Sequence, residues 1–150
     1  MTLASRLKDG TLLKNHCYID GRWVGGDAAQ IDVRDPATGE TIVTVPSLGA
    51  EETRTAIEAA GRAQKEWAAR SAKERAVVLR RWFDLMMENQ DDLGAILTAE
   101  QGKPLAEAKG EIAYAAAFIE FYAEEAKRVY GSIVPAPTPD RRIVVLKQPV

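Results

Sequence analysis

One long segment with apolar stripes constrains the fold of this chain more than any other feature. It follows the stretch TAEQGKPLAEAKGEIAYAA, residues 98–116. Gly102 can adopt the left-handed conformation that ends a preceding helix, and Pro104 suits the first position of the next, where its missing N–H costs nothing. The pattern predicts a helix over residues 104–130, ending at Gly131, about 27 residues and roughly 40 Å long at 1.5 Å per residue.

The predicted long helix carries two apolar stripes, which favours burial on two sides. One stripe consists of Ile112, Ala115, Ala116, Ile119, Ala123, Ala126 and Val129. The other is aromatic and consists of Tyr114, Phe118 and Phe121. The second stripe predicts contact with another domain or another subunit. From the pattern alone, the aromatic side chains either pack in a core, the simpler role, or line the mouth of a pocket.

Turn signals divide residues 17–46 into two predicted β-hairpins, or one small antiparallel sheet. Asp20-Gly21 lies between two short apolar runs and favours a tight turn, because this pair accepts positive φ at low cost. The stretch from Asp35 to Gly39 is a second turn signal, with alternating apolar residues on both sides.

Residues 50–130 are predicted to be helical. Ser71 and Glu74 have the spacing of a capping box, and an apolar stripe follows them. Asn89 and Asp92 open a shorter helix before Gly102.

Three prolines in the stretch SIVPAPTPD, residues 132–140, exclude a helix and a central strand there. The following run RRIVVLKQPV, residues 141–150, is typical of a β-strand. An apolar strand-like run at the end of the sequence predicts that the chain is a piece of a longer protein.

Composition and charge exclude several classes of protein. The chain has 46% hydrophobic and 28% charged residues, as in an ordinary globular protein, and a net charge of -2. A chain with this balance has no broad positive field, so no nucleic-acid or membrane partner is expected. No apolar run is long enough for a membrane span. Cys17 is the single cysteine, which excludes an internal disulfide and fits a cytoplasmic location.

Taken one by one, the residues show no catalytic constellation. His16 and Cys17 are adjacent, but neighbours in an extended chain point to opposite faces, so His16 is not expected to activate the thiol. Carboxylates four residues apart share one helix face and are predicted to be solvated acids with nearby cations, rather than an acid/base pair; they are Glu107 with Glu111 and Glu120 with Glu124. No Gly-x-Gly-x-x-Gly motif or phosphate loop occurs.

The segments YIDGRWV, DPATGE, EQGKPLAEAKGEI and LKQPV together resemble the start of an aldehyde dehydrogenase. The likeness covers residues 18–150 and is strongest to the bacterial NADP-dependent succinate-semialdehyde dehydrogenases, with glutarate-semialdehyde dehydrogenase as a close relative. The resemblance implies an α/β fold, of which this piece holds the N-terminal hairpins, the first helices and an oligomerisation-type strand, and is mostly helical. Residues 1–134 are then the N-terminal part of the NAD(P)-binding domain, with hairpins in 17–46 and helices in 50–130. Residues 135–150 begin the oligomerisation sheet.

The resemblance also implies an activity for the parent protein. In this family a cysteine thiolate attacks the aldehyde, hydride passes to NADP or NAD, and water cleaves the thioester; here succinic semialdehyde would become succinate in 4-aminobutyrate degradation. None of the family's catalytic motifs matches a position in this chain, so the 150-residue chain alone is expected to be inactive and to bind no cofactor. The parent is expected to be a homo-oligomer. Two alternatives are a glutarate-semialdehyde dehydrogenase fragment and a non-enzymatic helical interaction module.

The family pattern points to few site residues in this sequence. Tyr114 and Phe118 match the helix that borders the substrate entrance in the family, and Glu111, one turn earlier, is expected on the rim. In some relatives an acidic residue before the Gly-Lys-Pro turn helps to hold a structural monovalent cation; this position is Glu100, with the carbonyl of Val33 as a second candidate ligand.

Overall fold

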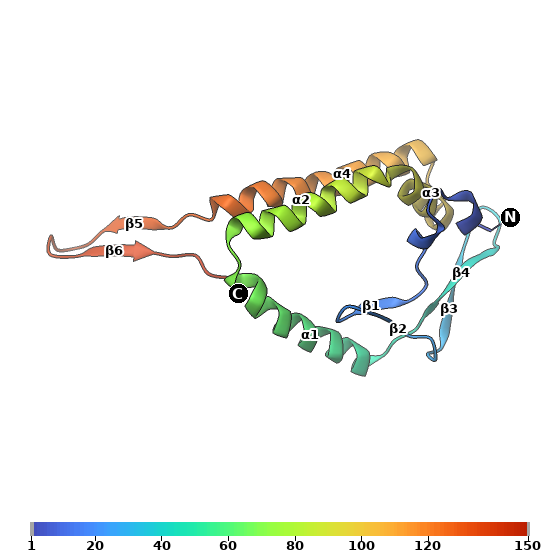
Figure 1. Cartoon of the computed structure of the whole chain (residues 1–150), viewed down its shortest axis with the longest axis horizontal. Helices are drawn as coiled ribbons and strands as arrows, with labels where there is room; N and C mark the ends of the chain where they lie inside the picture. Colours follow the sequence, from blue (N-terminus) through green and yellow to red (C-terminus); the bar gives the residue numbers. More distant parts are fainter. Residues whose placement is uncertain (1, 150) are drawn as a thin grey trace.

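A computed structural model describes residues 2–149 and shows an open frame of helices with a projecting two-stranded arm (Figure 1). The elements in chain order are η1 (Ala4–Arg6), η2 (Gly10–Leu12), β1 (Cys17–Ile19), β2 (Arg22–Val24), β3 (Gln30–Arg34), β4 (Thr41–Pro46), α1 (Ala50–Ala69), α2 (Ala72–Glu88), α3 (Gln90–Gln101), α4 (Leu105–Glu125), η3 (Ala126–Arg128), β5 (Ser132–Pro135) and β6 (Arg142–Val145).

The N-terminal strands form two separate antiparallel hairpins, one of the two predicted arrangements. In the first, Asp20 and Gly21 have φ values of 50° and 78°, so the Asp-Gly turn forms as predicted. In the second, Gly39 has a φ of 75° and ends the predicted turn. The β3–β4 ladder has an irregularity between Val33 and Arg34.

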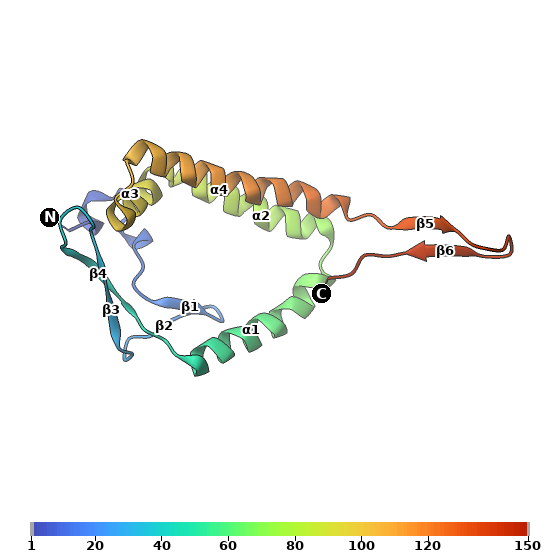
Figure 2. The ribbon, with the colours of Figure 1, turned by 180° about the vertical axis from the view of Figure 1, so that it is seen from behind.

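Helices α2 and α4 lie side by side and antiparallel, with α3 at the corner between them, whereas α1 lies apart from this group (Figures 1 and 2). Small residues make this close packing possible. The small residues buried on these helices are Ala76 on α2, Gly94 on α3, and Ala108, Ala116 and Ala123 on α4. A β-carbon on Gly94 would lie 2.9 Å from the Cγ of Lys109, so α3 and α4 touch at this point.

Two of the predicted signals at the helix ends, the capping box at Ser71 and the stop at Gly102, are confirmed. The Ser71 hydroxyl accepts a hydrogen bond from the Glu74 N–H at 3.3 Å, and the Glu74 carboxylate accepts one from the Ser71 N–H at 2.8 Å. Hydrogen bonds from the Ser71 hydroxyl and N–H lower the pKa of Glu74. Gly102 ends α3 in the left-handed conformation with a φ of 76°.

The prediction for the length of the last helix is wrong at both ends. Pro104 is the cap and not the first helical residue, because its ψ of 138° is extended. The α-helix stops at Glu125 and tightens into the 3-10 turn η3, a common way to satisfy the last carbonyl groups of a helix. Val129, with a ψ of 81°, then leaves the helix before Gly131 is reached.

The arm consists of β5 and β6, paired with Ser132 opposite Val145, and it projects away from the helices (Figure 1). Pro135 lies at the end of β5, which is an edge strand, as the prolines require. The first strand of the arm begins at Ser132, three residues before position 135, where the oligomerisation sheet was predicted to start. Val150, the last residue of the predicted oligomerisation sheet, lies outside the described residues.

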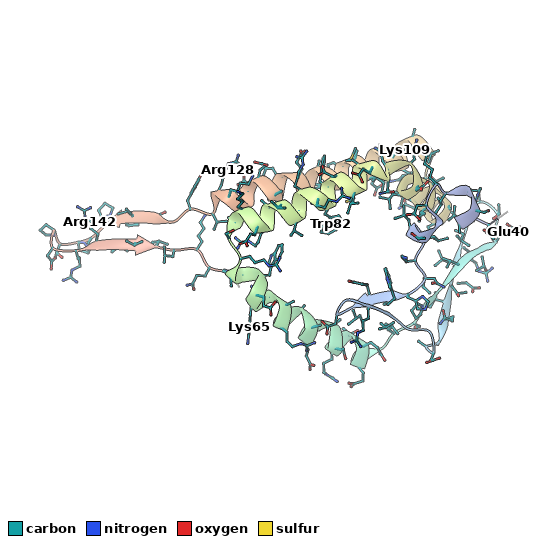
Figure 3. All side chains as sticks on the ribbon, in the orientation of Figure 1. Glu40, Lys65, Trp82, Lys109, Arg128 and Arg142 are labelled. Atoms are coloured by element: carbon teal, nitrogen blue, oxygen red, sulfur yellow. The ribbon has the colours of Figure 1, made fainter. Side chains whose placement is uncertain are left out.

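Much apolar surface of this frame stays open. No large side chain of residues 2–149 is fully buried. Lys65 on α1 and Arg142 on the arm point away from the neighbouring elements (Figure 3). Large apolar side chains are exposed on the helices and the arm, among them Ile57, Val77, Trp82, Phe121, Ile133 and Leu146.

Candidate functional site

An aromatic row on α4 is the most distinctive candidate site. Residues three or four apart in a helix share a face, and this spacing brings Tyr114 and Phe118 together. Their ring centroids lie 4.9 Å apart, with an interplanar angle of 80°, which is the edge-to-face geometry favoured by aromatic quadrupoles. Tyr114 is 66% exposed and Phe118 is 48% exposed, so the second stripe of the predicted helix is uncovered in this chain.

The row is longer than the sequence stripe suggested, because Tyr122 belongs to it. The Phe121 and Tyr122 rings lie 5.3 Å apart at 85°. Tyr114, Phe118, Phe121 and Tyr122, together with Ala117, line an apolar hollow of about 280 Å³. Tyr122 lies four residues after Phe118, so the same spacing rule identifies it. We call these four rings the aromatic row.

Glu111 lies one turn before Tyr114, and Lys103 forms an ion pair with it. Lys103 is half-buried in the turn between α3 and α4, so the pair joins this turn to the first half of α4. The negative charge of Glu111, next to the aromatic row, is therefore balanced by the positive charge of Lys103.

Two further carboxylates on α4 also lie beside a cation, whereas Glu107 is exposed and has no ion pair among residues 2–149. Glu120 accepts a hydrogen bond from the Arg80 guanidinium of α2 at 2.7 Å. Glu124 lies 3.6 Å from the Lys127 ammonium group. The prediction that nearby cations match these acids is confirmed for Glu111 and Glu124, and Glu120 serves instead to join α4 to α2.

The single cysteine has no base beside it. Cys17 is the first residue of β1 and pairs with Val24 of β2. The neighbouring His16 ring contacts Asn15 instead, with 2.8 Å between Nδ1 and the side-chain oxygen. Within the described part of the chain, no hydrogen bond reaches the Cys17 thiol. The separation of His16 from the thiol stays a prediction.

The two candidate cation ligands, Glu100 and Val33, lie on α3 and β3, and the turns that follow these two elements are in contact. Glu100 is exposed near the end of α3, and Val33 is half-buried in β3. The turns that follow these two elements touch at Gly102 and Pro36, where a β-carbon on Gly102 would lie 2.8 Å from the Pro36 Cγ. Between residues 2 and 149, no group of three or more His, Cys, Asp or Glu side chains is placed to hold a metal ion. The Glu100 and Val33 site stays a prediction.

Comparison with known proteins identifies the family. The profile described as "Aldehyde dehydrogenase family" matches residues 23–150. The chain belongs to the aldehyde dehydrogenase family. The α/β fold and the resemblance seen in the sequence are therefore confirmed.

Individual relatives agree with this assignment. The chain is 61% identical to glutarate-semialdehyde dehydrogenase of Pseudomonas aeruginosa and 53% identical to the NADP-dependent succinate-semialdehyde dehydrogenase of Escherichia coli, covering 97% of this chain and 30% of each relative. A crystal structure of succinate-semialdehyde dehydrogenase from Burkholderia pseudomallei superimposes with a TM-score of 0.89 at 58% identity, over 92% of this chain and 29% of that one. The chain thus spans about 30% of the length of the relatives it matches.

The aldehyde dehydrogenase chain has no helix among residues 2–149 that combines the length and the apolar character needed to cross a membrane.

Proposed function

We propose that this chain is the N-terminal part of an NAD(P)-dependent aldehyde dehydrogenase that oxidises succinic semialdehyde to succinate in 4-aminobutyrate degradation. The observation that carries the proposal is the high identity, over nearly the whole chain, to enzymes named for ω-semialdehydes of dicarboxylic acids. On this proposal residues 1–134 belong to the cofactor domain and residues 135–150 begin the oligomerisation sheet of a homo-oligomer. The reducing cytoplasm, which suits the lone Cys17, is its proposed location.

The chemistry of the proposed enzyme lies outside this chain. Cys17 has no base within hydrogen-bond reach, so it does not fit the role of the thiolate nucleophile. The described residues also provide no glycine-rich cradle for the phosphates of NADP or NAD, so they do not fit the cofactor. We therefore propose that the 150-residue chain alone neither turns over aldehyde nor binds the cofactor.

What this chain contributes to the proposed function is the wall of the entrance. Tyr114 and Phe118 present exposed ring faces and edges, which suits contact with the hydrocarbon part of a small aldehyde. The negative charge of Glu111 is balanced by its ion pair with Lys103. A neutralised rim does not repel a substrate that carries a carboxylate, as a semialdehyde of a dicarboxylic acid does.

A second candidate substrate is glutaric semialdehyde, which is one methylene longer. The higher identity to the enzyme named for it favours this candidate. One methylene in a pocket changes selectivity by about 10–200-fold, so a direct comparison separates the two substrates.

The test is an assay of the full-length protein with both semialdehydes and both cofactors. A ratio of kcat/KM at least tenfold in favour of succinic semialdehyde supports the first candidate, and the reverse ratio supports the second. The absence of NADP or NAD reduction with either substrate contradicts the proposed function. The 150-residue chain assayed alone tests its proposed inactivity, since turnover above a no-protein control contradicts that part.

A third possibility, a free-standing helical interaction module, makes a different prediction. The 150-residue chain would then show a cooperative melting transition and a defined stoichiometry in solution. As a fragment, with an open arm and exposed apolar helix faces, it is expected to self-associate without a defined stoichiometry. Light scattering distinguishes the two.

A further inference from the structure

The first turns of the chain are fixed to α3 by one buried carboxylate. Asp92 is 6% exposed, and it accepts hydrogen bonds from the backbone N–H groups of Lys8 at 3.0 Å and Asp9 at 2.8 Å. A carboxylate can be buried without a large free-energy cost only when hydrogen-bond donors contact its oxygens. The burial of Asp92 therefore depends on the segment around Lys8 and Asp9 being in place. We call this segment, residues 3–9, the N-terminal strap. It precedes residue 23, where the match to the family profile begins.

A second carboxylate joins the strap to two helices at once. The Asp91 side chain lies 2.7 Å from the Lys8 ammonium group of the strap and 2.6 Å from the Lys109 ammonium group of α4. Next to it, the Gln90 side-chain amide donates to the Lys109 carbonyl at 2.9 Å. The strap therefore contacts α3 directly and is linked to α4 through Asp91.

The apolar side of the strap faces two elements. Leu3 and Leu7, the residues on either side of the short 3-10 turn η1, are both buried. Leu3 lines one groove with Ala95 and Ala99 of α3, and another with Thr41 and Ile42 of β4. Figure 1 shows the N-terminal turns in the space between α3 and the β3–β4 hairpin. Leu3 is thus a wedge with α3 on one side and the hairpin on the other.

From these contacts we propose that the N-terminal strap is a releasable clasp that holds the β3–β4 hairpin against the α3–α4 corner. When the strap is seated, its polar end is bound to Asp91 and Asp92, and Leu3 at its apolar end lies between α3 and the hairpin. When it leaves, the hairpin keeps only the contact of Pro36 with Gly102 among the close contacts described above. The hairpin then opens together with the strap, as one local unit.

Hydrogen exchange on the full-length protein tests the clasp in two independent variants. Asp92→Asn weakens the polar end, because an amide has one acceptor oxygen in place of two. Leu3→Ala removes the apolar wedge and leaves Asp92 intact. The matched controls are Asp84→Asn, a half-buried residue of α2 that pairs with Arg80, and Ile57→Ala, an exposed residue of α1; both lie away from the strap.

The expected result is at least about tenfold faster exchange of the Lys8 and Asp9 amides and of the ladder amides in Gln30–Pro46, in both variants. Amides in the middle of α4 keep their exchange rate, and the controls match the unchanged protein. Two results overturn the proposal: strap amides that exchange faster while the hairpin keeps its rate, and an equal rise over all elements, which indicates global unfolding. Unchanged strap amides in both variants also overturn it. None of these readouts depends on the proposed enzymatic activity.

Discussion

Pro36 of the β3–β4 turn lies against Gly102 of the α3–α4 turn, so close that a β-carbon on Gly102 would come within 2.8 Å of the Pro36 Cγ. The same glycine has a φ of 76°, a conformation that side chains with a β-carbon rarely adopt. Gly102 therefore meets two requirements at once: it ends α3, and it lets the hairpin approach the helices.

Gly102→Ala should lower the free energy of unfolding by about 1–2 kcal/mol from the left-handed conformation alone, with a further loss from the contact with Pro36. Urea unfolding of the full-length protein measures this. The matched control is Gly110→Ala on α4, where an added β-carbon meets no atom within 4 Å. In this helical position alanine should stabilise by up to about 1 kcal/mol. Equal effects of the two substitutions would contradict this account of Gly102.

Local features of this fold were predictable from the sequence. The Asp20-Gly21 turn, the Ser71–Glu74 capping box and the left-handed Gly102 each depend on residues within a few positions of one another. Spacing alone contains this information, since caps and turns are local hydrogen-bonding solutions. The aromatic stripe was predictable for the same reason.

Contacts between distant segments were not predictable. Asp92 was assigned to a helix start, yet it also binds the Asp9 N–H, 83 positions earlier in the chain. No spacing rule links these positions. The end of the last helix was missed because Gly131 is a strong stop signal, whereas the tightening at Ala126 depends on the path of the chain into the arm.

Two neighbouring alanines on α4 should respond differently to enlargement. Ala116 is 0% exposed, between α4 and the helices packed on it, whereas Ala117 lies in the aromatic hollow and is exposed. Ala116→Leu should lower the free energy of unfolding by about 1–3 kcal/mol, because the close helix contact has no room for three more carbons. Ala117→Leu should change it by less than about 0.5 kcal/mol. Denaturant midpoints measure both, and a larger loss for Ala117→Leu would contradict the observed packing.

Loss of the capping box at the start of α2 should have both a stability effect and a titration effect. Ser71→Ala removes the hydroxyl that accepts from the Glu74 N–H, and loss of such a cap typically costs about 1 kcal/mol. The pKa of Glu74 should also rise toward its usual value, because the Ser71 hydroxyl that donates to the Glu74 carboxylate is the main cause of its lowering. NMR titration of the Glu74 carboxyl carbon measures this rise. Ser47→Ala in the loop after β4 is the control, and a pKa of Glu74 that stays low in Ser71→Ala would contradict the assignment.

Asp91 should make stability depend on acid in a defined range. Hydrogen bonds from Lys109 and Lys8, together with their positive charges, lower its pKa from 3.8 to about 2. Because the folded-state pKa lies below the unfolded one, the contribution of Asp91 is fully present above pH 3.8 and is lost as the pH falls toward 2. Asp91→Asn should therefore unfold more easily than the unchanged chain near neutral pH, and this difference should shrink steadily below pH 3.8. Urea midpoints from acid to neutral pH measure it, at low salt because these exposed pairs are screened. A difference between the two proteins that stays constant down to the acid limit would show that Lys8 and Lys109 do not act on Asp91 through its charge.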